Sequence, residues 1–389
     1  MESVRPNTTR TLRKKSRLNL LQAGKMDLTF FSLVIILLTI GLVMLFSASY
    51  AYAYTVYGDS YKFISKQLLF AGAGVAVMLV VSKIDYHIYR KFAWPLYALA
   101  VVLLIVVLLL PPLQEGFDYK RWIVIGPINF QPSEIAKFAI VLLFAHLISV
   151  NYKQMEKFTF GVLFFGILLA IVCALVVVET HLSATLLIFS IGICLMIVGG
   201  IKLRYVGFGL AAGVGLGAVA ILSGVVDYGS SRIQYWLNPW AAPRGEGYQT
   251  IQSLLSIGSG GFLGRGIGQS RQKYLWVPEP HNDFIFAIVC EELGYIGALI
   301  IILLFCMLVW RGFVVAMRAP DKFGSLMAVG LTFQVGVQTA LNIMVVTNTI
   351  PNTGISLPFF SYGGTALMIL LAEMGVVLSI SRASNLKKT

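Results

Sequence analysis

The stretch LTFFSLVIILLTIGLVMLFSAS, from Leu28 to Ser49, contains 22 residues and no charged one. At about 1.5 Å of rise per residue, a helix of roughly 20 apolar residues crosses the hydrocarbon core of a bilayer. We therefore predict that this stretch spans a membrane. It lacks the short apolar core and the small-residue cleavage site of a removable signal peptide, so we expect it to remain as a helix.

Similar apolar runs recur along the chain. Hydrophobic residues make up 58% of the 389 residues and charged residues only 12%, which is more apolar surface than one soluble core can hide. We predict an all-α membrane protein with about ten transmembrane helices and one long extracytoplasmic loop (225–283) between helices 7 and 8. The predicted spans are 28–49, 63–81, 92–110, 134–150, 159–178, 183–200, 206–224, 284–310, 324–346 and 361–381.

The domain organisation follows from these runs. We predict a basic cytoplasmic tail at 1–27, a single polytopic membrane domain at 28–382 and a second cytoplasmic tail at 383–389. Lysine and arginine collect at the ends of alternate spans, so the positive-inside rule places both termini in the cytoplasm. This distribution also argues against nucleic acid as the partner of a chain whose net charge is +13.

Two predicted outer segments are basic despite this rule. The segment 111–133 carries Lys120 and Arg121, and the long loop carries five basic residues, among them Arg244 and Arg271. Long loops cross the membrane largely regardless of charge, so the topology stands. Basic groups on this face indicate an anionic ligand, such as a phosphate.

The stretch YLWVPEPHND, from Tyr274 to Asp283, is the first candidate for chemistry. Its two prolines predict a helix that begins near position 281, with Asp283 in the first turn at the outer mouth of a span. This carboxylate is either a helix cap or a general base at the interface. Further along, Glu291 and Glu292 lie either at the interface or buried in the bundle, and the sequence leaves both possibilities open.

The second candidate is the stretch from Lys120 to Lys137, which contains a predicted helix start at QPS (131–133). Glu134 and Lys137 are spaced i, i+3 and therefore share a helix face. A lysine one turn inside a membrane helix needs an anion, either Glu134 itself or a bound phosphate. The third candidate, Asn348 to Thr365, is a turn-rich, uncharged re-entry that either lines a cavity or serves as a structural turn.

Other site classes have weak support in the sequence. The glycine-rich run at 258–268 follows no strand, and the chain has no GxxxxGK[ST] motif, so no ATP site is predicted. The four cysteines lie in apolar runs and are expected to pack, and no metal-ligand spacing is evident. The stretch Gln249–Gly261 predicts a short interfacial helix within the long loop.

Together these segments resemble the SEDS family of cell-wall polymerases, which is named for shape, elongation, division and sporulation. The resemblance covers most of residues 27–382, with the same order of motifs and number of spans. GQSRQK and SLPFFSYGG resemble the FtsW and SpoVE branch more than the RodA branch. The stretches that carry the resemblance are Arg121–Trp122, FQPSEIAK (130–137), Asn238–Trp240, Gly247–Leu254, GIGQSRQK (266–273), Pro278–Glu292 and GISLPFFSYGG (354–364).

The resemblance implies an enzyme of the bacterial cytoplasmic membrane, a peptidoglycan glycosyltransferase. It would polymerise lipid II, an undecaprenyl-pyrophosphate-linked disaccharide peptide, into β-1,4 glycan strands by inversion, with undecaprenyl pyrophosphate as the leaving group. Asp283 matches the family's essential aspartate and is expected to be the catalytic base. The residues expected to bind substrate or pyrophosphate are Lys137, Arg121, Glu134, Arg244, Arg271 and Ser361. The residues expected to support them are Glu279, His281, Trp122, Glu291 and Glu292.

The family also implies partners, namely a class B penicillin-binding transpeptidase and divisome proteins. No cofactor is predicted with certainty, although a divalent cation, Mg or Mn, is compatible with the pyrophosphate site. One departure concerns the outer turn Glu179-Thr-His181, where the family often has an aspartate at the position of His181, so no catalytic role is assigned to that turn. Two rival functions remain, a lipid II flippase and a non-catalytic divisome scaffold.

Overall fold

The structure, a computed structural model, describes residues 24–111, 120–126, 128–205, 207, 233–245, 247–274 and 276–386. Helices dominate it. The α-helices are α1 (Leu28–Tyr57), α2 (Lys62–Val81), α3 (Ala93–Leu109), α4 (Pro132–Val150), α5 (Phe165–Val178), α6 (Leu182–Val198), α9 (Tyr248–Gly260), α10 (Ile285–Met317), α11 (Lys322–Val346) and α12 (Gly364–Leu386). Shorter helical turns are η1 (Tyr86–Phe92), η2 (Tyr152–Gln154), η3 (Phe158–Phe164, a π-helix leading into α5) and η4 (Pro239–Ala241).

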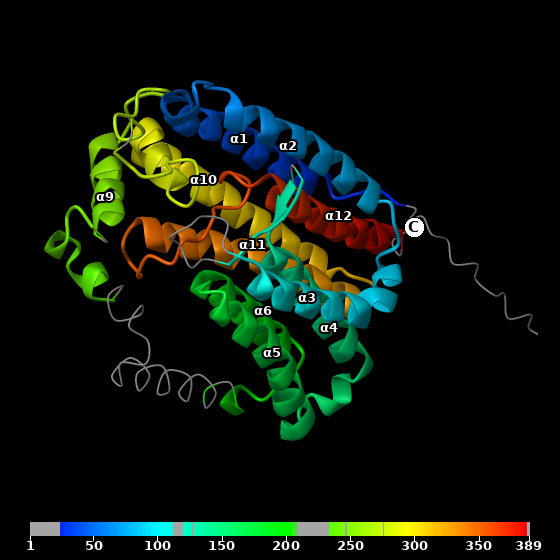
Figure 1. Cartoon of the computed structure of the whole chain (residues 1–389). Helices are drawn as coiled ribbons and strands as arrows, with labels where there is room; N and C mark the ends of the chain where they lie inside the picture. Colours follow the sequence, from blue (N-terminus) through cyan, green and yellow to red (C-terminus); the bar gives the residue numbers. More distant parts are fainter. Residues whose placement is uncertain are drawn as a thin grey trace, which may run out of the picture.

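The prediction of an all-α membrane protein is confirmed. Within the described ranges, eight helices are long and apolar enough to cross a membrane, and α6 is a shorter apolar helix. These nine coincide with nine of the ten predicted spans. The remaining predicted span, 206–224, lies outside the described residues apart from position 207. The helix predicted at 249–261 is α9, which packs against α10 and α11 at one end of the bundle (Figure 1).

The described ends of the chain meet at the opposite end of the bundle from α9 (Figure 1). Arg382 donates to the carbonyl of Gly24 at 2.7 Å, and the backbone N–H of Asp27 donates to Ser381 at 3.0 Å. The Asp27 carboxylate also forms an ion pair with Arg311 at the far end of α10, at 2.8 Å. We call this the terminal end and the other the α9 end.

Helix α10 is broken at Gly294, where φ is 68°. The backbone groups that the break frees are bound by the loop that follows α9. Arg265 and Gly266 donate to the carbonyls of Glu291 and Glu292, while Tyr295 and Ile296 donate to the carbonyls of Gly261 and Phe262. The backbones at Gly294 and Gly264 are in direct contact, and only glycine fits at position 294, because a Cβ there would lie 2.2 Å from the nitrogen of Gly264.

The segment between α11 and α12 re-enters the bundle, as the turn-rich stretch at 348–365 predicted. A Cβ on Gly41, near the middle of α1, would lie 2.4 Å from the carbonyl oxygen of Phe359. The rings of Phe359 and Phe360 lie 6.4 and 5.9 Å from that of Phe305 on α10. The segment is therefore irregular backbone enclosed by helices, the setting in which such backbone is tolerated at membrane depth.

A short hairpin precedes α4 and was not predicted. Strands β1 (Ile123–Ile125) and β2 (Ile128–Phe130) pair antiparallel, with Ile123 opposite Phe130. The turn uses Gly126 at a φ of 59°. Thr365 at the start of α12 donates to the carbonyl of Asn129 at 2.8 Å, which ties the hairpin to the re-entrant segment.

Candidate active site

The backbone around Asp283 is held by three consecutive carbonyl contacts. The carbonyl of His281 accepts from the N–H of Tyr362 at 2.9 Å, and that of Asn282 accepts from the Ser361 hydroxyl at 2.9 Å. The carbonyl of Asp283 accepts from the Asn342 amide at 2.7 Å. Three separate anchors in three residues leave this backbone little freedom, so the position of the Asp283 carboxylate is preorganised.

The Asp283 carboxylate does not cap a helix, which corrects the predicted helix start near position 281. Helix α10 begins at Ile285, and its N-cap position, Phe284, makes no side-chain cap. Asp283 instead lies half-buried in the turn before the helix, close to Gly354, whose Cβ would lie 3.2 Å from Oδ2. The capping alternative is therefore set aside, and the carboxylate is available for another role.

The surroundings of Asp283 raise its pKa to about 6. Burial is the largest cause, the nearby negative charge of Glu279 adds to it, and the positive charge of Arg121 opposes it. A carboxyl whose pKa lies near neutral pH is a better proton acceptor than an ordinary surface aspartate. Burial and charge thus give Asp283 the basicity that a general base needs.

Arg121 lies between Asp283 and the outer turn that follows α5. It donates to the carbonyl of Thr180, and its charge acts on Asp283, Glu179 and His181. Burial raises the pKa of Glu179 to about 8, against the opposing charge of Arg121. Burial, with the charges of Arg121 and Lys137, lowers the pKa of His181 to about 3, so this imidazole is neutral.

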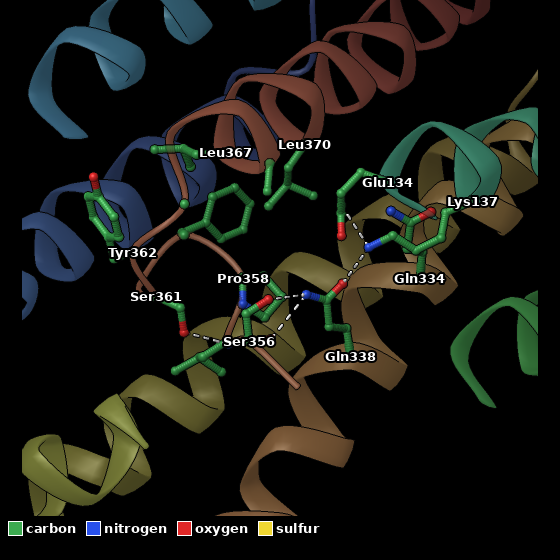
Figure 2. Close-up of a pocket in the computed structure, with 14 residues that line it drawn as sticks. Glu134, Lys137, Gln334, Gln338, Ser356, Pro358, Ser361, Tyr362, Leu367 and Leu370 are labelled. Atoms are coloured by element: carbon green, nitrogen blue, oxygen red, sulfur yellow. Dashed lines mark hydrogen bonds and ion pairs between the residues drawn. The ribbon is translucent and has the colours of Figure 1, made fainter. Parts of the chain in front are cut away.

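Lys137 lies in the wall of a small cavity with about 40 Å³ of free volume, enough for a few water molecules. Its side chain is only 2% exposed. It pairs with Glu134 at 2.8 Å and donates to Gln338 at 3.3 Å. Figure 2 shows Lys137 pointing between these two partners, with Ser356 of the re-entrant segment beyond Gln338. The ion pair with Glu134, one of the two alternatives for Lys137, is thus present, and it borders a polar cavity.

One face of α11 carries a polar stripe that the sequence analysis missed. Gln334, Gln338 and Asn342 are spaced four residues apart and are all buried. Asn342 holds the carbonyls of Asp283 and Ile355, and Gln338 donates to Ser356 at 3.0 and 3.1 Å. Three amides repeating every four residues within an apolar span would have revealed this stripe, because such side chains face the bundle interior.

Glu373 on α12 was also missed, although an acid in the middle of an apolar run is itself a signal. It is 2% exposed, and its Oε2 accepts from Gln334 at 2.9 Å. Its Oε1 has no hydrogen-bond partner within the described part of the chain, and neither does Oε1 of Gln334. The polar stripe therefore joins the cavity to a second buried acid.

Glu291 and Glu292 are buried within the protein, just before the break in α10. The Glu291 carboxylate accepts from the N–H of Arg271 at 2.9 Å and from the hydroxyl of Ser270 at 2.5 Å. Glu292 pairs with Lys273 at 2.9 Å, and both of these side chains are fully buried. These acids therefore anchor the loop after α9 to the break in α10.

Two arginines of the predicted pyrophosphate set are exposed. The side chains of Arg244 and Arg271 are exposed, and no hydrogen bond or ion pair joins either side chain to the Asp283 cluster in the described ranges. Arg271 contributes its backbone N–H to the anchor around Glu291.

The remaining predicted residues lie around Asp283. Ser361 fixes the backbone and lines the cavity, and the His281 ring packs on Phe63 with ring centroids 4.1 Å apart. Glu279 accepts from Asn282 at 2.8 Å, and Trp122 is 38% exposed beside Arg121. No group of three or more His, Cys, Asp or Glu side chains that could hold a metal occurs among the described residues.

Comparison with known proteins identifies the family. The profile of the FtsW, RodA and SpoVE cell cycle proteins matches residues 27–386. The chain is 40% identical to stage V sporulation protein E of Bacillus subtilis over 92% of this chain and 97% of that protein. It is 36% identical to a probable peptidoglycan glycosyltransferase FtsW of Geobacter metallireducens, over 94% and 97% of the two chains.

Solved structures share the fold. A chain from a peptidoglycan synthase complex, studied for its coordination of polymerization and crosslinking, matches with a TM-score of 0.77 and 27% identity, covering 92% of this chain and 98% of that one. The rod shape determining protein RodA of Thermus thermophilus matches with a TM-score of 0.66 and 25% identity, over 92% and 97%. The agreement of profile, relatives and fold over nearly the whole length shows that the chain belongs to the SEDS family, the FtsW, RodA and SpoVE cell cycle proteins.

Proposed function

We propose that this protein is a peptidoglycan glycosyltransferase that polymerises lipid II at the α9 end of the bundle, in cell division or sporulation. One observation carries the proposal: Asp283, a carboxylate with a raised pKa, is rigidly held within range of the charge of Arg121, and the charges of Arg121 and Lys137 both act on His181. The relatives of this chain include probable peptidoglycan glycosyltransferases, which supports the same activity.

In the proposed reaction, Asp283 removes the proton from the 4-hydroxyl of the acceptor sugar as that oxygen attacks the anomeric carbon of the donor. The new bond joins this oxygen to the anomeric carbon, and the bond to the undecaprenyl pyrophosphate breaks, so the configuration inverts. The proton remains on Asp283 until solvent removes it. The pKa of about 6 supports this role, because the carboxylate is mostly ionised at neutral pH and still basic.

The departing pyrophosphate needs positive charge. Arg121 supplies a planar guanidinium near Asp283, and Lys137 supplies an ammonium within the cavity, where its pairing with Glu134 keeps it oriented. The cavity is small, with about 40 Å³ of free volume, and groups of the size of a water molecule or a phosphate oxygen fit beside Lys137. We infer that only phosphate oxygens reach Lys137, and that the sugars remain nearer to Asp283.

The distribution of basic residues indicates how the protein is oriented in the membrane. The terminal end of the bundle carries Arg90, Lys153, Arg311 and Lys322, and we assign it to the cytoplasm by the positive-inside rule. The α9 end with Asp283 then faces the extracytoplasmic space. Within the described part of the chain, α10 and α3 expose apolar side chains that could meet a single-pass partner, and we propose a class B penicillin-binding transpeptidase. The structural relative from a synthase complex supports such a partner.

The decisive experiment uses purified full-length protein, its transpeptidase partner and fluorescent lipid II, with glycan chains resolved on a gel. We expect Asp283→Asn to abolish chains while lipid II binding persists, since the amide keeps the shape of the side chain but cannot accept the proton. Lys137→Met should weaken both binding and polymerisation. The exposed acid Glu156, which lies near Lys202 at the terminal end, provides the matched control Glu156→Gln, which should behave as wild type.

The rival functions predict different outcomes in the gel assay, in vesicles and in cells. Glu291 and Glu292 are engaged in the loop anchor, which leaves them poorly suited to carry protons in a transport cycle. A flippase predicts transfer of lipid II across vesicles without glycan chains. A scaffold predicts normal cell-wall synthesis after Lys137→Met. Normal chain formation by Asp283→Asn would exclude the mechanism proposed here.

A further inference from the structure

Glu373 lies at the middle of the membrane bundle and has no role in the proposed chemistry. Its partner Gln334 is the thirteenth of the 25 residues of α11, the midpoint of that helix. Ionisable groups at this depth are costly and are usually functional. The side chain is 2% exposed, with one carboxylate oxygen bound by Gln334 and the other without a partner in the described ranges.

The polar stripe connects Glu373 to the anion site. Gln334 lines the same cavity as Lys137 and Glu134 (Figure 2). The charges of Lys137 and Glu134 both act on Glu373, the first attracting its carboxylate and the second repelling it. Lys137 thus lies within electrostatic range of two acids, one in direct contact and one reached across the cavity wall.

Other charged groups on the helices around α12 are exposed or engaged elsewhere. Lys66 of α2 is exposed, and Lys322 of α11 lies over the ring of Tyr152. In the described part of the chain several others are paired in the terminal-end contacts or in the loop anchor: Asp27 with Arg311, Arg90 and His87 with Asp321, and Glu291 and Glu292 with residues 270–273. Lys62 of α2 lies over the ring of Tyr57 at the α9 end. The charge of Glu373 is therefore balanced chiefly against the pair Glu134 and Lys137.

The charge balance of the cavity decides what it can bind. With both acids ionised, two negative charges face the single positive charge of Lys137, and a pyrophosphate would enter a negative site. With a proton on Glu373, the remaining pair is neutral, and the unpartnered oxygen of Gln334 can accept the new O–H. An ionised carboxylate with an unsatisfied oxygen is also costly at this depth.

We propose that Glu373 is a proton-binding site linked to anion binding at Lys137, so that the protein takes up one proton from solvent when a lipid diphosphate binds. The proposal rests on the proposed function, because it takes Lys137 as a phosphate ligand. Glu373 acts here through Lys137 and the amide stripe, as a positioning residue that does not touch the substrate. Lipid diphosphate affinity then falls as pH rises.

The test measures binding of undecaprenyl diphosphate to the full-length protein in detergent between pH 6 and pH 9. For the wild type, linkage of one proton raises the apparent Kd by up to about tenfold per pH unit in the window where Glu373 titrates. The glutamine in Glu373→Gln is permanently neutral and keeps a partner for Gln334. A plot of log Kd against pH should therefore have a slope lower by up to one than the plot for wild type. Above that window it should bind more tightly than wild type, by up to about tenfold for each pH unit. Other titrating groups, including the ligand, are common to both proteins.

A second measurement does not depend on the variant being stable. A pH-indicator dye in weakly buffered solution should report proton uptake when wild type binds the diphosphate, and infrared difference spectra should gain a protonated-carboxyl band. Equal Kd slopes for wild type and a folded Glu373→Gln, or no proton uptake by wild type, would overturn the proposal. If Lys137→Met binds the diphosphate as tightly as wild type, it is the proposed phosphate site that fails, which is a separate outcome.

Discussion

The basicity of Asp283 can be tuned from a neighbour that has no part in the proposed proton transfer. Glu279 is exposed, and its negative charge raises the pKa of Asp283. Replacing Glu279 by Gln removes that charge and retains an acceptor for Asn282. We expect the pKa of Asp283 to fall, and the acid limb of the pH–rate profile to move to lower pH.

The magnitude follows from the exposure of Glu279. Interactions with exposed charges are worth roughly 0.3–1 kcal/mol, which corresponds to a shift of about 0.2–0.7 pH units. With a pKa of about 6, wild type retains about a tenth of its maximal rate at pH 5, because only that fraction of the carboxyl is ionised. The Glu279→Gln variant should then retain about 1.5- to 4-fold more of its own maximum at pH 5.

The assay is polymerisation of fluorescent lipid II from pH 4.5 to 8 at saturating substrate, with each variant normalised to its own plateau. Glu156→Gln, an exposed acid at the terminal end, controls for the loss of one negative charge. A profile for Glu279→Gln that coincides with wild type, or that moves to higher pH, would refute the assignment of the acid limb to Asp283. So would a wild-type profile that is flat between pH 5 and pH 7.

Three further predictions concern residues that hold the backbone and the buried charges near the site in place. Gly354→Ala adds a methyl group 3.2 Å from the carboxylate of Asp283, at a residue whose φ is 67°. We expect the free energy of unfolding to fall by about 1–2 kcal/mol, measured by the melting temperature. The polymerisation rate in the gel assay should be about 10- to 100-fold lower. Lys273→Met leaves the charge of Glu292 buried without its partner and should lower the free energy of unfolding by about 3–5 kcal/mol. The double variant Lys273→Met with Glu292→Gln should recover part of that loss in thermal unfolding. If the losses of the two single variants simply add in the double variant, the buried pair is contradicted. Gly294→Ala should destabilise by about 1–3 kcal/mol or more, because its methyl meets backbone at 2.2 Å, while Gly72→Ala, which meets nothing within 4 Å, should leave the melting temperature near wild type.

Much of the fold was predictable because lipid imposes a length and a composition on each span. Nine apolar runs became helices, and most boundaries lie within a few residues of those expected. Helices α1 and α10 instead continue to Tyr57 and Met317, well beyond the predicted ends at 49 and 310. The start of α4 at Pro132 and the range of α9 agree with the sequence patterns. The hairpin at 123–130 was missed because its strands are only three residues long. The break at Gly294 was missed because the apolar run continues through it and gives no periodic signal.

The amino-acid sequence alone determined that the chain crosses a membrane many times, that basic groups lie on both faces, and that Asp283, Lys137 and Arg121 are the residues to examine. Only the tertiary structure decided which charges meet. It buried Glu291 and Glu292 in a loop anchor, left Arg271 and Arg244 exposed, and lined up the amides of α11 between the Asp283 turn and Glu373. The physical reason is that hydropathy sets how far a segment enters the bilayer, whereas the partners of a polar side chain depend on helix rotation and packing, which bring together residues distant in sequence.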